Sequence, residues 1–331
     1  MRALFAFACC LGLGFFLWAC GGQGSRDELG FEDGDRVIFI GDSLTHSGAF
    51  PRLLETYCHV RHPERRLFFR NAGVRGDRVA DVLARYDDDI HWFHPDHAIV
   101  LLGMNDGGMR SFDDGLFDRF TSGMEALFTR LDEDGVEVIV LGPTYFDVMQ
   151  SRKATRDAGE EWNMKANDYD QALRRYGAWL HDRCLARGYH FVDVGEKMRR
   201  KTLEMREEDA SFSLTEDGIH PTIEGDELMV RWILAQLGEG VAEGSEVWSG
   251  DAARLNEERY KHLIRPLRER WYAVKAKRYE LGSDEEAFTA WFKMEEAKLA
   301  EQERIASARE AEIYELLGRE HRGMELSDEA Q

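Results

Sequence analysis

Cysteine is scarce in this sequence of 331 residues, and the scarcity excludes a disulfide-rich fold. The chain has five cysteines, and Cys9, Cys10 and Cys20 all lie near its start. Cys58 and Cys184 remain, so the rest of the chain contains either one disulfide or two buried free thiols. With 43% hydrophobic residues, a chain of this length can bury a large apolar core instead.

The sequence also lacks the cysteine and histidine spacings that are typical of zinc sites. His91, His94 and His97 recur at every third position, but Pro95 interrupts any helix that would place them on one face. We interpret them as ordinary surface or boundary histidines. Neither a metal ion nor an organic cofactor is predicted.

Positive charge is in deficit, with 43 lysines and arginines against 63 aspartates and glutamates, for a net charge of −20. A protein that binds nucleic acid needs clustered basic side chains for its phosphate contacts, and the sequence has no such cluster. We therefore expect no nucleic-acid partner and interpret the acidity as a solvated surface.

Long apolar runs are missing after the first residues. A short positive start followed by the apolar residues 3–19 is typical of a secretory signal peptide rather than a folded helix. This run ends in Leu17-Trp18-Ala19-Cys20, which resembles a bacterial lipobox and implies lipidation of Cys20. Trp18 departs from the lipobox pattern, so ordinary cleavage after Ala19, giving a secreted protein, is the alternative.

The lipobox interpretation predicts where the protein is found. The polar, glycine-rich residues 20–34 would be a flexible tether, and the lipid on Cys20 would anchor the protein to a membrane of the bacterial cell envelope. The rest of the chain would then lie on the periplasmic or outer-membrane side.

Residues 35–238 predict an α/β domain. Short apolar segments at residues 36–40, 67–71, 98–102, 136–141 and 190–194 alternate with amphipathic segments of helical spacing. Strands that are apolar throughout are typical of a parallel sheet covered by helices on both faces. We expect five parallel strands, helices near 49–60, 79–86, 113–131, 169–187, 196–205 and 223–237, and a long polar loop at 147–167.

The remaining residues differ in composition. Residues 239–251 are rich in glycine and acidic side chains and predict a linker, whereas residues 252–318 predict a helical extension of three charge-rich segments. Residues 319–331 are expected to be disordered. We expect the extension to pack its apolar stripes on the main domain, and a free partner-binding arm is the alternative.

Polar residues that suit nucleophilic catalysis follow the predicted strands. Ser43 comes directly after the first strand in Gly41-Asp42-Ser43-Leu44, where ligands bind in open α/β sheets. Asp217 and His220 share a D-x-x-H spacing, which lets a carboxylate orient an imidazole base. Gly73 follows the second strand and Asn105 the third, so a backbone N–H and a carboxamide can stabilise an oxyanion together with the N–H of Ser43. Each residue alone is an ordinary cap or turn residue, but the five residues together at one sheet edge predict an active site.

These blocks resemble the SGNH hydrolase superfamily, the GDSL-like lipases and esterases. The carriers of the resemblance are Gly41-Asp42-Ser43-Leu44, Asn71-Ala72-Gly73-Val74-Arg75-Gly76, Gly103-Met104-Asn105-Asp106 and Asp217-Gly218-Ile219-His220-Pro221. The resemblance covers about residues 36–237 and departs from the family at Asp77-Arg78, where relatives often place threonine.

The resemblance implies a flavodoxin-like three-layer α/β/α sandwich and a serine esterase of bacterial lipoprotein type. It implies that Ser43 is the nucleophile, that His220 is the base oriented by Asp217, and that Ser43, Gly73 and Asn105 form the oxyanion hole. No cofactor is implied.

The substrate is less defined than the reaction. The polar segment 147–167, with Trp162, suits a sugar better than a long acyl chain, so we expect O-deacetylation of a carbohydrate. A lysophospholipase or thioesterase-like lipase is the alternative, as is a non-catalytic surface-binding lipoprotein. We further expect a helix of the extension to border the active-site edge, where Arg265, Arg268 or Arg270 would contact substrate. The sequence does not determine the oligomeric state.

Overall fold

The computed structural model describes residues 30–159, 168–241 and 248–328. The predicted signal peptide 1–19, Cys20 and most of the tether therefore lie outside the described residues, and lipidation stays a prediction. Within the described ranges, no helix is both long and apolar enough to cross a membrane.

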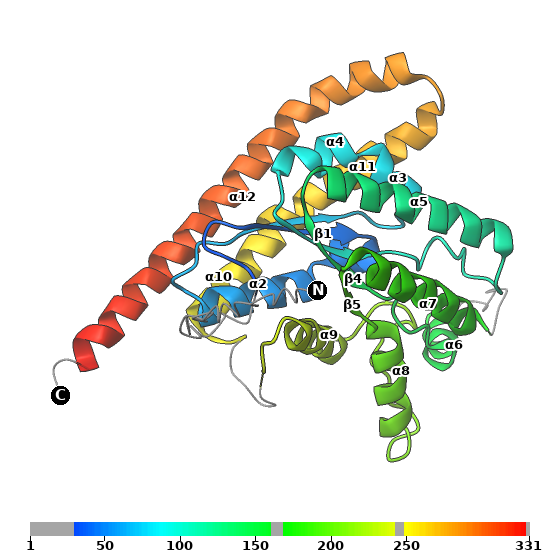
Figure 1. The fold of residues 1–331 in the computed structure, drawn as a ribbon, viewed down its shortest axis with the longest axis horizontal. Coiled ribbons are helices and arrows are strands. Elements are labelled where there is room, and N and C mark those ends of the chain that lie inside the picture. The colour runs from blue at the N-terminus through cyan, green and yellow to red at the C-terminus, as the bar shows by residue number, and fades with distance from the viewer. Residues whose placement is uncertain (1–29, 160–167, 242–247, 329–331) are drawn as a thin grey trace, which may run out of the picture.

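The centre of the molecule is the predicted sheet of five parallel strands, in the order β2-β1-β3-β4-β5 (Figure 1). This order is that of flavodoxin-like folds, in which the chain reverses direction across the sheet between β1 and β3. β5 ends two residues earlier than expected, because the Asp193 side chain caps the next helix by accepting from the N–H of Glu196 at 3.0 Å. The strands are β1 Arg36–Gly41, β2 Phe68–Gly73, β3 His97–Leu101, β4 Glu137–Leu141 and β5 His190–Val192.

Alternate strand residues build two separate cores, one on each face of the sheet. Val37 and Phe39 face a cluster completed by α2 and α9, whereas Ile38 and Ile40 face a cluster completed by α3, α4, α5 and α7. The three-layer α/β/α sandwich is thereby confirmed. The helices of this part are α1 Ser43–Ser47, α2 Ala49–Arg61, α3 Val79–Ala84, α4 Tyr86–Asp89, η1 His91–Phe93, α5 Asp114–Glu133, α6 Val148–Asp157, α7 Tyr169–Arg187, α8 Val194–Met205 and α9 Ile223–Gln236.

The prediction of a loop over residues 147–167 is wrong in its first half, which forms α6. Asp147 caps this helix, and its Oδ1 accepts from the N–H of Gln150 at 3.2 Å. An aspartate followed three residues later by glutamine is a helix-start signature that the charged composition of the segment obscured. Residues 160–167, which include Trp162, lie outside the described residues.

The helical extension packs on the main domain, as predicted. It consists of α10 Gly250–Arg259, the single π-helical turn η2 Tyr260–Ile264, α11 Arg265–Leu281 and α12 Glu285–Asp328. α10 lies against α2 (Figure 1). α11 lies against α1 and β2. The end of the extension was predicted too early, because α12 continues past residue 318 to Asp328.

Cys58 and Cys184 are both buried free thiols, which decides between the two alternatives left by the sequence. Cys58 belongs to the core on one face of the sheet and Cys184 to the core on the other. Among the spaced histidines, His97 lies within β3, with its Nε2 2.7 Å from Asp35 Oδ2.

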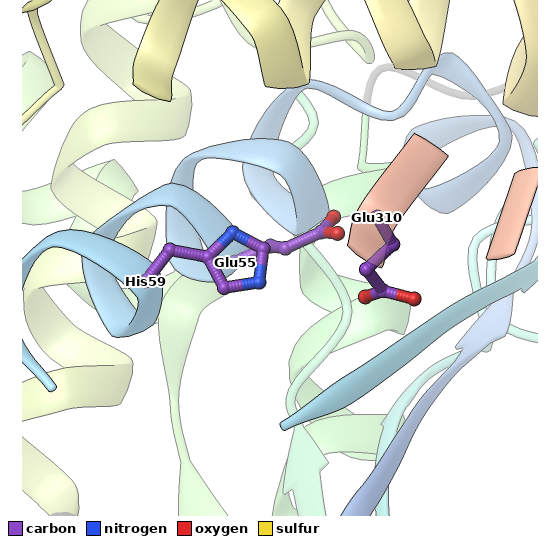
Figure 2. Close-up of side chains that lie close together, drawn as sticks. All are labelled: Glu55, His59 and Glu310. Atoms are coloured by element: carbon purple, nitrogen blue, oxygen red, sulfur yellow. The ribbon is translucent and has the colours of Figure 1, made fainter. Parts of the chain in front are cut away.

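A buried polar cluster joins the extension to α2 at Glu55, His59 and Glu310 (Figure 2). In the described part of the chain, these three residues are the one group whose atoms lie close enough together to hold a metal ion. The buried Arg259 guanidinium forms an ion pair with Glu55 and lies 3.5 Å from Glu310 Oε2. A protein cation therefore compensates the two carboxylates, and we interpret the cluster as a structural contact.

Candidate active site

Ser43 is the first residue of α1 and lies just beyond the carboxyl end of β1. This is the point where the chain reverses its direction across the sheet, between β1 and β3. Asp42 caps this short helix, and its Oδ1 accepts from the N–H of Leu44 at 3.0 Å. The preceding Gly41 permits the tight turn, because a Cβ there would lie 2.1 Å from Thr45 Oγ1. The local sequence thus fixes the direction in which the serine leaves the strand.

His220 and Asp217 reach Ser43 from the turn that precedes α9. His220 Nδ1 lies 2.7 Å from Asp217 Oδ2, and His220 Nε2 lies 2.9 Å from Ser43 Oγ. Because a carboxylate only accepts, Nδ1 carries the proton and Nε2 is free to accept from the serine hydroxyl. The structure therefore brings the three predicted residues into one hydrogen-bonded chain.

The backbone of this turn also binds the aspartate. Asp217 Oδ1 accepts from the N–H groups of Ile219 at 2.9 Å and His220 at 2.8 Å. Gly218 between them adopts a φ of +93°, a conformation that side-chain-bearing residues rarely adopt. Asp217 is consequently held by both its oxygens, one on the backbone and one on the imidazole.

The helix α6 anchors this turn from the other side. The N–H of Asp147 donates to the Gly218 carbonyl at 2.9 Å. The buried Asp147 carboxylate is itself held by Arg206 at 2.6 Å and by the hydroxyl of Ser213 at 2.7 Å. Asp147 is therefore a supporting residue that the sequence analysis missed, and its signal was the helix-start signature.

The two titrating members of the chain shift each other's pKa in opposite directions. The hydrogen bond that His220 donates to Asp217 raises the pKa of His220, and burial opposes this only in part. Burial also disfavours ionised Asp217, but its hydrogen bonds from His220 prevail and lower its pKa to about 2. At neutral pH, Asp217 is thus an anion beside the imidazole.

Gly73 and Asn105 lie near Ser43, but their donor groups already have acceptors. The Gly73 N–H donates to Asn71 Oδ1 at 2.8 Å. Asn105 Nδ2 donates to Asp42 Oδ2 at 3.1 Å and to the Asp77 carbonyl at 3.0 Å. The Ser43 N–H lies in the first turn of α1, where the helix offers it no carbonyl.

Asn71 and Asp42 accept hydrogen bonds from the two predicted donors, and the sequence analysis assigned neither residue a role of its own. Asn71 Nδ2 donates to the Thr45 carbonyl at 2.6 Å, so its carboxamide bridges α1 and Gly73. Burial raises the pKa of Asp42 to about 7. Both residues stand inside the motif blocks, so the signal was their position, but their partners become apparent only in the fold.

The extension does border this edge of the sheet, but the predicted substrate contact of Arg268 is wrong. Arg268 is fully buried and forms an ion pair with Asp89. Arg270 pairs with Glu295 at 3.2 Å, and the exposed Arg265 donates to the Ser47 carbonyl at 3.2 Å. Arg268 therefore has a structural role in contact with the main domain, because its guanidinium pairs with the buried carboxylate of Asp89.

A flavodoxin-like sheet with a Ser-His-Asp chain at the carboxyl ends of its strands defines the class of SGNH hydrolases. The chain belongs to the GDSL-like lipase/acylhydrolase family, whose pattern it matches over residues 39–228. It is accordingly an ester-hydrolysing enzyme, and the alternative of a non-catalytic binding lipoprotein is not supported.

Similar proteins of known description fall in the same class. An acetylxylan esterase of Geobacillus stearothermophilus is 23% identical over 229 residues, which are 62% of this chain and 94% of that protein. A crystal structure of an acetylxylan esterase from the same organism matches with a TM-score of 0.51 at 18% identity, covering 65% of this chain and 99% of the other. A gut microbial diltiazem-metabolizing enzyme matches with a TM-score of 0.69 at 17% identity, covering 87% of this chain and 96% of the other.

Proposed function

We propose that this protein is a serine esterase that removes acetyl groups from a carbohydrate through an acyl-serine intermediate. The observation that carries the proposal is the unbroken chain from Asp217 through His220 to Ser43, with distances of 2.7 Å and 2.9 Å. A nucleophile, a base and a group that orients the base are what such acyl transfer requires.

In the first half of the reaction, Ser43 Oγ attacks the carbonyl carbon of the ester while its proton passes to His220 Nε2. The carbonyl double bond opens, and the oxygen becomes an oxyanion facing Gly73, Asn105 and the Ser43 N–H. When the intermediate collapses, the bond to the alcohol oxygen breaks and His220 returns its proton to that oxygen. The sugar alcohol leaves and Ser43 is acetylated.

In the second half, water takes the place of the alcohol. His220 accepts a proton from the water as its oxygen attacks the acetyl carbon, and a second oxyanion forms at the same position. Its collapse breaks the bond to Ser43 Oγ, which regains the proton from His220, and acetic acid is released. Asp217 stays ionised throughout and stabilises the imidazolium.

The oxyanion donors are preorganised by acceptors within the protein. The carboxamide of Asn71 holds the Gly73 N–H, and Asp42 holds Asn105. The oxyanion would share the donors with these acceptors or displace the acceptors, which are neutral or partly protonated. Its full charge makes it the stronger acceptor. Donors that are already aligned need little reorganisation when the charge develops.

The exposure of the site supports a short acyl group on a polar alcohol. The His220 side chain is 41% exposed and that of Asp217 is 45% exposed. A site for a long acyl chain is expected to be an enclosed, mostly apolar pocket. The acetylxylan esterase relative supports the same choice, although the lipase alternative stays open to test.

The substrate is tested with a panel of esters assayed on the wild-type protein. We expect kcat/KM to be highest for acetylated xylo-oligosaccharides and for 4-nitrophenyl acetate, and to fall steeply with acyl length. Higher kcat/KM for long-chain nitrophenyl esters or lysophospholipids would favour the lipase alternative instead.

The nucleophile is tested with Ser43→Ala. We expect this variant to lose about 10⁴-fold or more in kcat, because the triad acts as a unit. Its melting temperature is expected to stay close to that of the wild type, since only one hydroxyl is removed. A variant that kept a tenth of wild-type turnover would show that Ser43 is not the nucleophile.

A further inference from the structure

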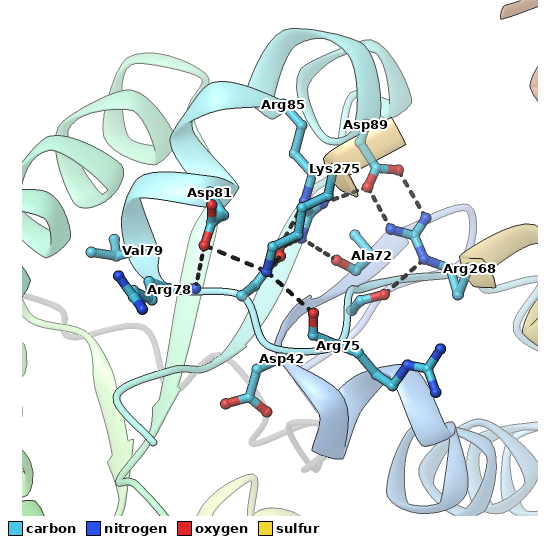
Figure 3. A network of polar contacts seen from close by, with 12 residues as sticks. Asp42, Ala72, Arg75, Arg78, Val79, Asp81, Arg85, Asp89, Arg268 and Lys275 are labelled. Carbon is cyan, nitrogen blue, oxygen red and sulfur yellow. Dashed lines mark hydrogen bonds and ion pairs between the residues drawn. The ribbon is translucent and has the colours of Figure 1, made fainter. Parts of the chain in front are cut away.

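Arg268 and Lys275 of helix α11 reach the last residue of β2 and the segment that joins β2 to α3, together called the β2–α3 loop (residues 73–78) (Figure 3). Arg268 Nε donates to the Gly73 carbonyl at 2.9 Å. Lys275 Nζ donates to the Arg75 carbonyl at 3.2 Å and lies 2.9 Å from Asp77 Oδ1. The extension therefore holds both ends of a loop that begins with a proposed oxyanion donor.

Two guanidinium groups hold the two peptide planes that meet at Gly73. Arg85 Nη2 donates to the Ala72 carbonyl at 2.8 Å, and Arg268 donates to the Gly73 carbonyl. The Ala72–Gly73 peptide carries the Gly73 N–H, so Arg85 both orients this donor and polarises it from the carbonyl side. The main domain thus fixes one plane and the extension fixes the next.

Asp89 links these two arginines. Both oxygens of its carboxylate accept from Arg268, Oδ1 from Nη1 at 2.9 Å and Oδ2 from Nη2 at 2.6 Å. The carboxylate also forms an ion pair with Arg85. Burial alone would raise the pKa of Asp89, but the charges of Arg268 and Arg85 outweigh it and lower the pKa. The two guanidinium groups on either side of Gly73 therefore share one carboxylate.

The side chain that follows Gly73 is also held by the extension. Val74 is fully buried in a cluster with Leu267, Trp271 and Val274 of α11. Its backbone N–H donates to the Gly41 carbonyl at 3.1 Å, close to the start of α1. The loop is therefore clamped between the nucleophile turn and α11.

The far end of the loop reaches the second proposed donor. The Asp77 carbonyl accepts from Asn105 Nδ2, and the Asp77 carboxylate lies 2.7 Å from Arg85 Nη2 and 2.9 Å from Lys275 Nζ. Lys275 thus contacts Asp77, and Asp77 in turn contacts the Asn105 carboxamide that would stabilise the oxyanion.

We propose that Arg268 is a positioning residue for the oxyanion hole, with Lys275 acting on the same loop, so that the extension completes the active site. The inference rests on the proposed function, because it assigns Gly73 and Asn105 their oxyanion roles. Small displacements of such donors lower the rate strongly, since a shift of about 1 Å can cost about 10²-fold. Arg268 touches neither substrate nor the reacting atoms.

The test compares Arg268→Met with Arg259→Met in the full-length protein. Both arginines belong to the extension, both are buried, and both pair with buried carboxylates. Arg259 contacts Glu55 and Glu310 but no residue of the β2–α3 loop. In Arg268→Met, Asp89 keeps Arg70 at 2.8 Å and Arg85, which favours folding of the variant.

Two rates are measured well below the melting temperature of each variant. The first is turnover of 4-nitrophenyl acetate, and the second is labelling of Ser43 by a fluorophosphonate, whose adduct is tetrahedral and polar like the intermediate. We expect Arg268→Met to lower kcat and the labelling rate by about 10- to 100-fold with KM within about threefold. Arg259→Met is expected to lose at least as much thermal stability and yet keep both rates within about threefold.

Conservative and peripheral variants sharpen the test. Arg268→Lys retains the positive charge and is expected to recover only part of the lost kcat, because its compact ammonium cannot bind Asp89 and Gly73 together as the guanidinium fork does. Lys275→Met, which removes a less buried contact, is expected to lower kcat by about threefold to tenfold, and it serves if Arg268→Met fails to fold.

Three outcomes would overturn the inference. Unchanged kcat and labelling in Arg268→Met, or in Lys275→Met where the first variant does not fold, would show that α11 does not position the donors. An equal loss of both rates in Arg259→Met would assign the effect to general destabilisation. A wild type that neither hydrolyses the ester nor is labelled at Ser43 would remove the proposed function, and this inference with it.

Discussion

His220 owes its tautomer and its basicity to one carboxylate. Asp217 lies 2.7 Å from Nδ1, which leaves Nε2 to accept from Ser43, and the same hydrogen bond raises the pKa of the imidazole. A base with a raised pKa is stronger when neutral but is protonated over a wider acid range. The pair therefore sets how the proposed reaction responds to pH.

A prediction of pH dependence follows from the raised pKa of His220. In the wild type, kcat/KM should fall as the pH drops through a pKa above 6.5, the ordinary value for histidine, because protonated His220 accepts no proton. In Asp217→Asn, the acid limb should move to lower pH, and the plateau should fall by about 10⁴-fold through loss of the correct tautomer.

A pH–rate profile of both proteins checks this. An acid limb at the same pH in the two profiles would mean that another group titrates there. The buried Asp42, with a pKa of about 7, is the alternative source of such a limb, and Asp42→Asn would identify it.

At this scale, the sequence predicts well which residues meet at the candidate site, and predicts their supports poorly. Ser43, Asp217 and His220 stand in short motifs, so local spacing alone brings Asp217 and His220 to one turn. Arg268 shows the opposite case. It is one of several arginines in a charge-rich helix, and nothing in its own segment distinguishes it from the others. Its partner Asp89 lies 179 residues earlier, and no local pattern records that pairing.

At the scale of elements, the end of β2 and the helix α1 approach each other more closely than a side chain permits. A Cβ on Gly73 would lie 2.4 Å from the His46 nitrogen and 2.6 Å from the Thr45 carbonyl carbon. The contacting atoms are backbone, so they have little freedom to yield. Glycine is required here by close packing as well as by its proposed donor role.

We therefore expect Gly73→Ala to be destabilised by about 1–3 kcal/mol, as in other overpacked sites, and to lose most of its esterase activity. Gly177→Ala is the matched control, because that buried glycine lies within α7 and a Cβ there has its nearest neighbour at 3.9 Å. The control should be neutral or stabilised by up to about 1 kcal/mol. Urea unfolding of both variants measures the difference, and equal stabilities would contradict the packing argument.

The elements themselves were largely predictable, with exceptions that have physical causes. The five strands follow from apolar runs, and the limits predicted for α7 match the structure. α6 was missed because Ser151 is its one buried residue and is polar, so no apolar stripe marks the helix. β5 was predicted too long because the cap at Asp193 starts the next helix early.

At the scale of the whole molecule, some of the many acidic side chains are buried in the interior. The chain carries a net charge of −20, and burial raises the pKa of Asp226 to about 8 and that of Asp106 to about 6. An unfolded aspartate ionises near 3.8, so the folded protein binds protons that the unfolded chain has released. This contribution to stability is present at low pH and is lost as the pH rises toward 8.

The last prediction is that the wild type becomes more stable when the pH is lowered from 8.5 to 6.5. Protonation of Asp226 alone should contribute roughly 1–2 kcal/mol over this range. Asp226→Asn removes that titration, so its melting temperature should change less between the two pH values. Parallel curves for the two proteins, recorded by calorimetry in matched buffers, would show that Asp226 does not titrate there.

The ion pair between Asp89 and Arg268 has a consequence for biosynthesis. The chain is made from its N-terminus, and domains generally fold as they emerge. The β2–α3 loop is synthesised early, but its clamp is 195 residues downstream of Gly73. A nascent chain that stops at the end of α9 has a complete sheet and all three residues of the Ser-His-Asp chain, yet Val74 has no apolar cover from α11. If α11 positions the oxyanion donors as proposed, the active site is complete only after the ribosome has translated this helix.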